Sequence, residues 1–210
     1  MEKMESGTTT LGIVCKDGII LATDKRTTWG GQFIVRKDAE KLNQISDNIA
    51  ITTAGSVSDI QMFIKLMKAE LKLRNLRTNR PMSVKEAANL ASRIMYDGAR
   101  TYFPNMTQVL MGGYDNSGFY LFEIDVDGAC MLYKDYFSTG SGSIVVFGVL
   151  EHAYKDGMTV KEGEDLAVKA VSAAIQRDPA SGNGIDVMMI TKDGMRKTVQ
   201  KKIQNVYVDR

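Results

Sequence analysis

The order of predicted strands and helices restricts the possible folds of this chain more than any other feature. Strands joined by short turns come first, then two helices, more strands, two further helices and closing strands. Strands clustered in this way favour antiparallel sheets over alternating βαβ units. We therefore predict an α+β fold, a four-layer α/β/β/α sandwich of two antiparallel sheets flanked by helix pairs.

Capping signals and helical spacing locate the helices. Ser83-Val84-Lys85-Glu86 and Thr159-Val160-Lys161-Glu162 are capping boxes, which open the second and fourth helices. The second helix is expected to reach about Tyr102, and the third to cover residues 144–154. Residues 27–31 are expected to form a turn, and residues 138–143 a loop leading into the third helix.

Length, charge and cysteine content exclude several classes of protein. At 210 residues the chain is expected to form one domain that buries roughly 70% of its unfolded surface. A net charge of +2 gives no electrostatic reason to expect nucleic acid or a membrane as a partner. Two cysteines without metal-type spacing indicate a reducing compartment. Residues 1–7 lack the apolar region of a secretory signal, so we expect a cytoplasmic protein.

The first two strands flank Lys16-Asp17-Gly18 and predict a hairpin with two possible registers. A two-residue loop of Asp17-Gly18 would place Thr8 and Asp24 on opposite faces. A three-residue loop with Gly18 in the left-handed conformation would pair Thr10 with Asp24 and bring Thr8 to the same face. We favour the second register because it lets a carboxylate approach Thr8.

The Gly7-Thr8 pair could supply both a nucleophile and a base if the peptide bond between the two residues is cut. The Thr8 hydroxyl and a new α-amino group would then lie on one residue. An α-amine has a pKa of about 7.7–8.0, so it can serve as a base near neutral pH. A threonine hydroxyl is a weak nucleophile until a neighbouring base activates it. Gly7 would not obstruct attack on its carbonyl, and its backbone can take strained angles. A single Gly-Thr pair is most often only a polar tail before a strand, so other residues must decide.

Other candidate motifs point to no metal, nucleotide or histidine-based chemistry. His152 is the only histidine, whereas zinc sites need several His or Cys ligands and a Ser-His-Asp mechanism would depend on it. Gly140-Ser141-Gly142-Ser143 precedes a helix, but Ile144 follows where a phosphate-binding loop needs its lysine and hydroxyl pair. We therefore expect no cofactor and no metal, and a serine hydroxyl near a site remains possible here.

Several short motifs, taken in their order and spacing, resemble a known family. That family is the proteasome β subunits, the N-terminal threonine hydrolases of the proteasome core, and the chain looks most like the single-type archaeal subunit. The resemblance covers the chain from Gly7 onward. The residues that carry it are Gly7-Thr8-Thr9-Thr10-Leu11-Gly12, Thr23-Asp24-Lys25-Arg26, Lys41-Leu42, Ala54-Gly55, Ser138-Thr139-Gly140-Ser141-Gly142-Ser143, Gln176-Arg177-Asp178-Pro179-Ala180-Ser181-Gly182 and Ile185-Asp186-Val187.

The resemblance implies an N-terminal nucleophile hydrolase fold and a role for each matching residue. Residues 1–7 would be a propeptide removed by self-cleavage at Gly7–Thr8, and residues 8–210 a single catalytic domain with Thr8 as nucleophile. Lys41 would place a cation beside the Thr8 hydroxyl and Asp24 would pair with that lysine. Gly55 would provide a backbone N–H that binds the oxyanion. Ser141, Asp178 and Ser181 would orient the Thr8 amine.

The same resemblance suggests a substrate pocket and partners. The uncharged residues at the pocket positions are Thr27, Ala39, Asn43, Thr53 and Gln61. The expected partners are other β subunits in stacked rings, proteasome α subunits, a regulatory ATPase that acts through the α rings, and unfolded protein substrates. The chain is thus expected to be a threonine endopeptidase subunit. Two alternatives are a non-catalytic β-type ring subunit and the simpler bacterial two-ring threonine protease.

Overall fold

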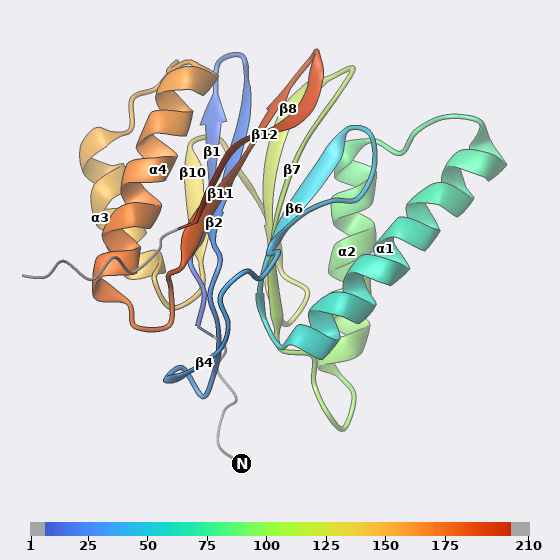
Figure 1. Cartoon of the computed structure of the whole chain (residues 1–210). Coiled ribbons are helices and arrows are strands. Elements are labelled where there is room, and N and C mark those ends of the chain that lie inside the picture. Colours follow the sequence, from blue (N-terminus) through green and yellow to red (C-terminus); the bar gives the residue numbers. More distant parts are fainter. Residues whose placement is uncertain (1–6, 203–210) are drawn as a thin grey trace, which may run out of the picture.

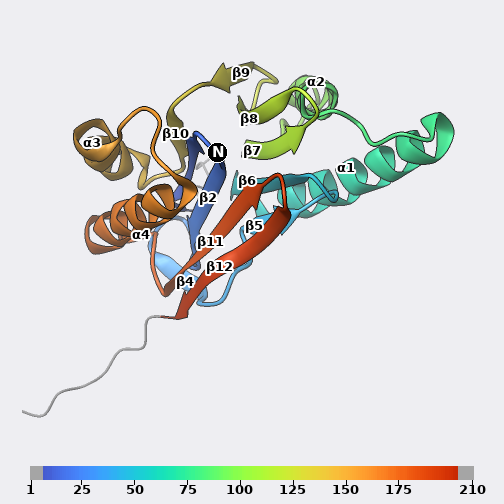
Figure 2. The same ribbon diagram turned by 90° about the horizontal axis from the view of Figure 1, so that it is seen from above.

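Four layers make up the computed structural model of the chain, which describes residues 7–202 (Figure 1). Two five-stranded antiparallel sheets pack face to face, and a helix pair covers the outer face of each. The view along the layers shows α3 and α4 on one side and α1 and α2 on the other (Figure 2). The predicted four-layer α+β sandwich is therefore confirmed.

The first sheet has the strand order β10-β1-β2-β11-β12 and is covered by α3 and α4. Buried side chains of β1, β2 and β11 pack against α4 in one apolar cluster. The α4 helix opens with the predicted capping box of Thr159 and Glu162. The bounds are β1 Thr10–Cys15, β2 Gly18–Asp24, β10 Tyr136–Thr139, β11 Gly184–Thr191, β12 Gly194–Lys202, α3 Ser143–Ala153 and α4 Val160–Arg177.

The second sheet has the order β5-β6-β7-β8-β9 and is covered by α1 and α2. The α2 helix opens with the predicted capping box of Ser83 and Glu86, and it ends at Ala99 rather than near Tyr102. The bounds are β5 Leu42–Gln44, β6 Ile49–Gly55, β7 Thr107–Asp115, β8 Gly118–Ile124, β9 Cys130–Tyr133, α1 Val57–Thr78 and α2 Val84–Ala99. Among the described residues, no helix is both long enough and apolar enough to cross a membrane.

Apolar side chains fill the space between the two sheets. A Cβ atom on Gly12 would lie 2.5 Å from the Leu121 side chain, so glycine lets β1 approach the facing sheet closely. Every residue of this inter-sheet cluster is at most slightly exposed. The cluster consists of Ile19, Leu21, Leu42, Ala50, Leu110, Leu121, Met188 and Ile190.

Both registers considered for the first hairpin are wrong. Cys15 pairs with Gly18 around a two-residue Lys16-Asp17 turn, so Thr10 lies opposite Thr23. The turn is held by contacts distant in sequence, because the Asp17 carboxylate accepts a hydrogen bond from the Val160 N–H at the start of α4. Asp24 consequently lies beside the backbone of Thr9, whose carbonyl accepts the Asp24 N–H at 3.1 Å.

Two further elements differ from the sequence-based expectation. The predicted loop before α3 begins with Ser138 and Thr139, the last two residues of strand β10, which pairs with β1 in an antiparallel ladder. The predicted turn at residues 27–31 includes strand β3 (Thr27–Trp29), which pairs with β4 (Phe33–Arg36). These two strands form a separate hairpin that belongs to neither main sheet and lies at the lower end of the molecule in Figure 1.

Candidate active site

Thr8 lies just before β1, buried and still joined to Gly7. Its hydroxyl donates a hydrogen bond of 2.7 Å to the Gly7 carbonyl oxygen. The Gly7 N–H donates to the Thr28 hydroxyl at 3.0 Å, so the β3–β4 hairpin holds the residue before Thr8. The predicted nucleophile is therefore adjacent to the carbonyl of the predicted cleavage site.

Lys41 and Asp24 form a buried ion pair with 2.7 Å between Lys41 Nζ and Asp24 Oδ1. The Asp24 side chain is 0% exposed and accepts three backbone N–H groups, from Thr9 at 3.0 Å and from Arg26 and Gly182 at 2.9 Å. Burial lowers the pKa of Lys41, and the Asp24 carboxylate opposes that effect. The carboxylate thus joins the end of β2, the segment before β1 and the loop after α4.

Ser141, Asp178 and Ser181 come together beside the Thr8 backbone. The Ser141 and Ser181 hydroxyls each donate to Asp178 Oδ2 at 2.6 Å. The Thr8 N–H donates to Ser141 Oγ at 3.2 Å, and Thr9 Oγ1 lies 2.6 Å from Ser181 Oγ. The group expected to orient an amine on Thr8 therefore contacts the nitrogen that would become that amine.

Pro179 fixes the backbone beside this group in the way its position in the sequence predicts. A residue before proline is restricted to extended conformations, and Asp178 has φ −94° and ψ 111°. The extended backbone at Asp178 ends α4, and the chain then turns to bring Ser181 back to the same carboxylate.

Gly55 ends strand β6 on the side of the sheet where Lys41 lies. The Thr53 N–H donates to the Lys41 carbonyl at 3.0 Å, and Gly55 follows Thr53 along the same strand. Gly55 has φ +126°, and a Cβ atom there would lie 1.9 Å from the Met106 carbonyl oxygen. Glycine is therefore required here both by conformation and by the approach of the Met106 backbone.

Four of the five predicted pocket residues lie on four different strands or helices, and Ala39 lies in the segment between β4 and β5. Ala39 is buried and its N–H donates to the Lys25 carbonyl at 2.9 Å. Thr53 is buried on β6, whereas the other three are at least partly exposed. The remaining positions are Thr27 on β3, Asn43 on β5 and Gln61 on α1.

Two residues at this site were missed by sequence reasoning. Thr28 accepts the Gly7 N–H through its hydroxyl, and Thr9 bonds both the Asp24 carboxylate and the Ser181 hydroxyl. The run of three threonines after Gly7 was a signal for Thr9. Thr28 carried no local signal, because its contact depends on how the β3–β4 hairpin folds back.

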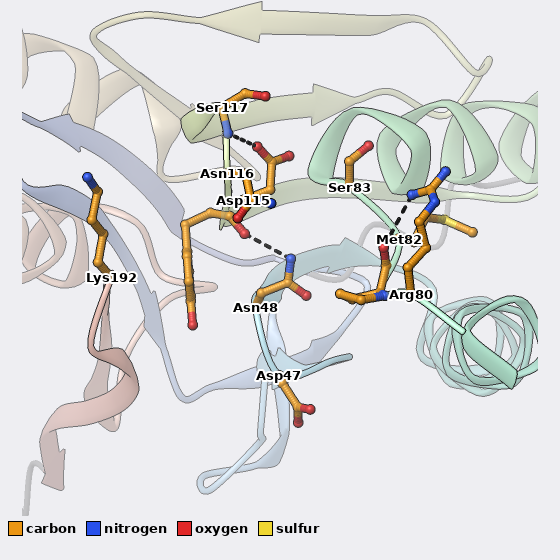
Figure 3. A pocket seen from close by; sticks show the side chains of 11 residues that line it. Asp47, Asn48, Arg80, Met82, Ser83, Asp115, Asn116, Ser117 and Lys192 are labelled. Atoms are coloured by element: carbon orange, nitrogen blue, oxygen red, sulfur yellow. Dashed lines mark hydrogen bonds between the residues drawn. The ribbon is translucent and has the colours of Figure 1, made fainter. Parts of the chain in front are cut away.

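A separate cleft of about 800 Å³ lies at the other end of the second sheet (Figure 3). It is lined by Asp115 at the end of β7, whereas Gly55 pairs with Thr107 at the beginning of β7. Two of its charged residues already have structural partners. Asp115 accepts the Val84 N–H at the start of α2, and Arg80 bonds Glu86 through both terminal nitrogens. The Thr8 cluster is the stronger candidate for an active site.

The family model described as Proteasome subunit matches residues 4–190. The chain belongs to the proteasome subunit family. It is 43% identical to the Proteasome subunit beta of Methanohalophilus mahii over 205 residues, which are 98% of this chain and 96% of that protein. Identity to the Proteasome subunit beta of Archaeoglobus fulgidus is 42%, over 98% of this chain and 95% of that protein.

These full-length similarities place the chain among the archaeal-type proteasome beta subunits, as the motifs indicated. A proteasome beta subunit is a component of the core particle and assembles there with other subunits. The match over nearly the whole length of archaeal relatives favours this form over the bacterial two-ring protease considered from the sequence.

Proposed function

We propose that this beta subunit is catalytic, a threonine-type endopeptidase that first cuts its own chain at Gly7–Thr8. The observation that carries the proposal is the 2.7 Å hydrogen bond from the Thr8 hydroxyl to the Gly7 carbonyl. A non-catalytic ring subunit would be expected to lack Gly7-Thr8, Lys41 or Asp24, and all four residues are in place.

Self-cleavage would begin with attack of Thr8 Oγ1 on the Gly7 carbonyl carbon. The bond between that carbon and the Thr8 nitrogen breaks as an ester to Oγ1 forms, and the hydroxyl proton goes to the leaving nitrogen. Water then hydrolyses the ester, which gives a carboxylate on Gly7 and a free hydroxyl and amine on Thr8. Oγ1 already lies next to this carbonyl, so little movement is needed to reach the attacking position.

Peptide hydrolysis would follow on the mature chain that begins at Thr8. The α-amine accepts the hydroxyl proton as Oγ1 attacks a substrate carbonyl, and later returns a proton to the leaving amine. The positive charge of the Lys41 ammonium, which is held by Asp24, would favour loss of the Thr8 hydroxyl proton. Water finally hydrolyses the acyl-enzyme ester and restores the free hydroxyl.

The remaining site residues would bind the developing charge and orient the amine. The Gly55 N–H donates to the oxyanion of the tetrahedral intermediate, a contact commonly worth about 3 kcal/mol. Ser141 would hold the Thr8 nitrogen in the position it already has, and Asp178, which also accepts a hydrogen bond from Ser181, would hold the Ser141 hydroxyl. Substrates would be unfolded proteins, reached in the cytoplasm inside stacked β rings capped by α subunits and served by a regulatory ATPase.

Substitution of Thr8 by alanine tests this proposal. In particles assembled from Thr8→Ala subunits, mass spectrometry should find residues 1–7 retained, and hydrolysis of a fluorogenic peptide should be lost. Thr78→Ala, at the exposed end of α1, is the matched control and should behave as wild type. Wild-type hydrolysis by a fully Thr8→Ala particle would show that another residue is the nucleophile.

A further inference from the structure

Gly7 is enclosed so tightly that no side chain fits on it. A Cβ atom at this position would lie 1.7 Å from Ala180 Cβ and 2.9 Å from Ala180 Cα. Non-bonded carbon atoms in proteins pack at about 3.5–4.0 Å, so the methyl group of Ala180 occupies the space that any larger residue would need. Ser141 Oγ would lie 3.1 Å away on another side.

The backbone of Ala180 is held in place and cannot easily retreat from Gly7. The Ala180 N–H donates to Asp178 Oδ1 at 3.1 Å, and the Ser181 N–H donates to the Asp178 carbonyl at 3.2 Å. Ala180 also follows Pro179, whose ring fixes one backbone angle. A movement of Ala180 would therefore disturb the carboxylate that binds both Ser141 and Ser181.

Together with two hydrogen bonds, the contact with Ala180 restrains Gly7 at three points. The Gly7 N–H is bonded to Thr28, its carbonyl accepts the Thr8 hydroxyl, and its Cα faces the Ala180 methyl group. These contacts fix the carbonyl of the scissile bond against Oγ1 of Thr8. A side chain on residue 7 would push that carbonyl away from the attacking oxygen.

We propose that Ala180 is a positioning residue for self-cleavage, and that its methyl group restricts the residue before Thr8 to glycine. This inference rests on the proposed self-cleavage and adds the residue that determines which precursor sequence can be processed. It assigns the glycine requirement to a steric contact with a named residue rather than to backbone flexibility alone.

A paired change of size at the two positions tests the inference. In the full-length chain assembled with proteasome alpha subunits, Gly7→Ala should slow release of residues 1–7 by about ten- to a hundredfold, the rate loss expected from overpacking a close contact. Adding Ala180→Gly should recover about tenfold of that loss. Recovery stays partial because Ala180 Cα remains 2.9 Å from the new Cβ atom. Cleavage is followed by mass spectrometry over time.

Ala180→Ser, added to Gly7→Ala, is the matched control. It keeps the Cβ atom and should therefore not restore cleavage. Equal rates with and without Ala180→Gly would overturn the inference and leave backbone conformation as the cause. Cleavage of Gly7→Ala at the wild-type rate would also overturn it, because residue 7 would then not need to be glycine. A chain produced with Thr8 as its first residue distinguishes a failure of the Ala180 inference from a failure of the proposed function. If that chain hydrolyses a fluorogenic peptide while the paired change fails, only the role of Ala180 is wrong. If it does not hydrolyse the peptide, the proposed function itself fails.

Discussion

Lys41 Nζ lies 2.7 Å from Asp24 Oδ1, in a part of the molecule where the lysine side chain is 8% exposed and the aspartate is fully buried. Removal of one partner from a buried ion pair leaves the other charge uncompensated, which is more costly than loss of the pair as a whole. The two residues are therefore coupled in stability as well as in their proposed chemistry.

The first prediction is that Lys41 and Asp24 act as a unit. Lys41→Met and Asp24→Asn should each lower peptide hydrolysis by at least about a hundredfold, because the first removes the cation proposed to act on Thr8 and the second removes the partner that orients it. The double variant should be little worse than the worse single variant. Kinetics of assembled particles, with circular dichroism to confirm folding, check this. Losses that multiply would show two independent roles.

The second prediction concerns stability and pH, through Glu123 on β8. Glu123 is 5% exposed, and burial, with smaller effects from Asp125 and Asp127, raises its pKa from 4.5 to about 7. Between these two values the folded chain keeps a proton that the unfolded chain has lost. Stability should therefore fall as pH rises through this range, by about 1–3 kcal/mol in total.

Urea unfolding at pH 5 and pH 8 measures this difference. Glu123→Gln should remove most of it, because the amide does not titrate. Asp165→Asn, which changes a carboxylate that is 65% exposed on α4, is the control and should keep the wild-type difference. An unchanged pH dependence in Glu123→Gln would show that other groups cause it.

The third prediction is a preference for cleavage after large uncharged residues. None of the five pocket candidates carries a charge, so an acidic or basic substrate side chain would find no counter-ion there. A panel of fluorogenic peptides that differ only in the residue before the cleaved bond measures this preference. Fastest cleavage after Glu or Arg would contradict the assignment. Gln61→Glu, which adds a negative charge on α1, should raise the relative rate after Arg.

The fourth prediction is that assembly triggers the cut at Gly7–Thr8. The hairpin that binds Gly7 through Thr28 exposes Trp29 and Phe33, each by more than 60%, and belongs to neither sheet. Contacts in a ring would cover such apolar side chains and fix the hairpin. Mass spectrometry should find residues 1–7 on the isolated subunit and a chain starting at Thr8 in the particle. An isolated monomer that already starts at Thr8 would exclude assembly as the trigger.

Local signals made much of the fold predictable from the sequence. The capping boxes that begin at Ser83 and Thr159 each span only four consecutive residues, and both open helices in the structure. Contacts between distant segments explain the errors. Strand β10 is only four residues long and exists through its pairing with β1, and the register of the first hairpin depends on a contact from Asp17 to α4.

In the candidate site, too, the residues that depend on contacts between distant segments could not be predicted from local sequence. Thr8, Asp24 and Lys41 were expected together only through the resemblance to a family, because each taken alone is an ordinary polar residue at the end of a strand. The structure brings Lys41 and Asp24 into contact and places Thr8 beside Ser141. Ala180 could not be identified from the sequence, since nothing in a buried alanine indicates what its methyl group faces.

The hydrogen bond from Gly7 to Thr28 joins the proposed propeptide to the β3–β4 hairpin. Release of residues 1–7 would remove this donor and leave the Thr28 hydroxyl to bond water. The hairpin would then make one hydrogen bond fewer to the rest of the domain, although its own strand pairing would remain. Within assembled particles, amide hydrogen exchange in the hairpin should therefore be faster in the mature chain than in Thr8→Ala subunits that keep residues 1–7. The hairpin would thus report, by its exchange rate, whether a given subunit has been processed.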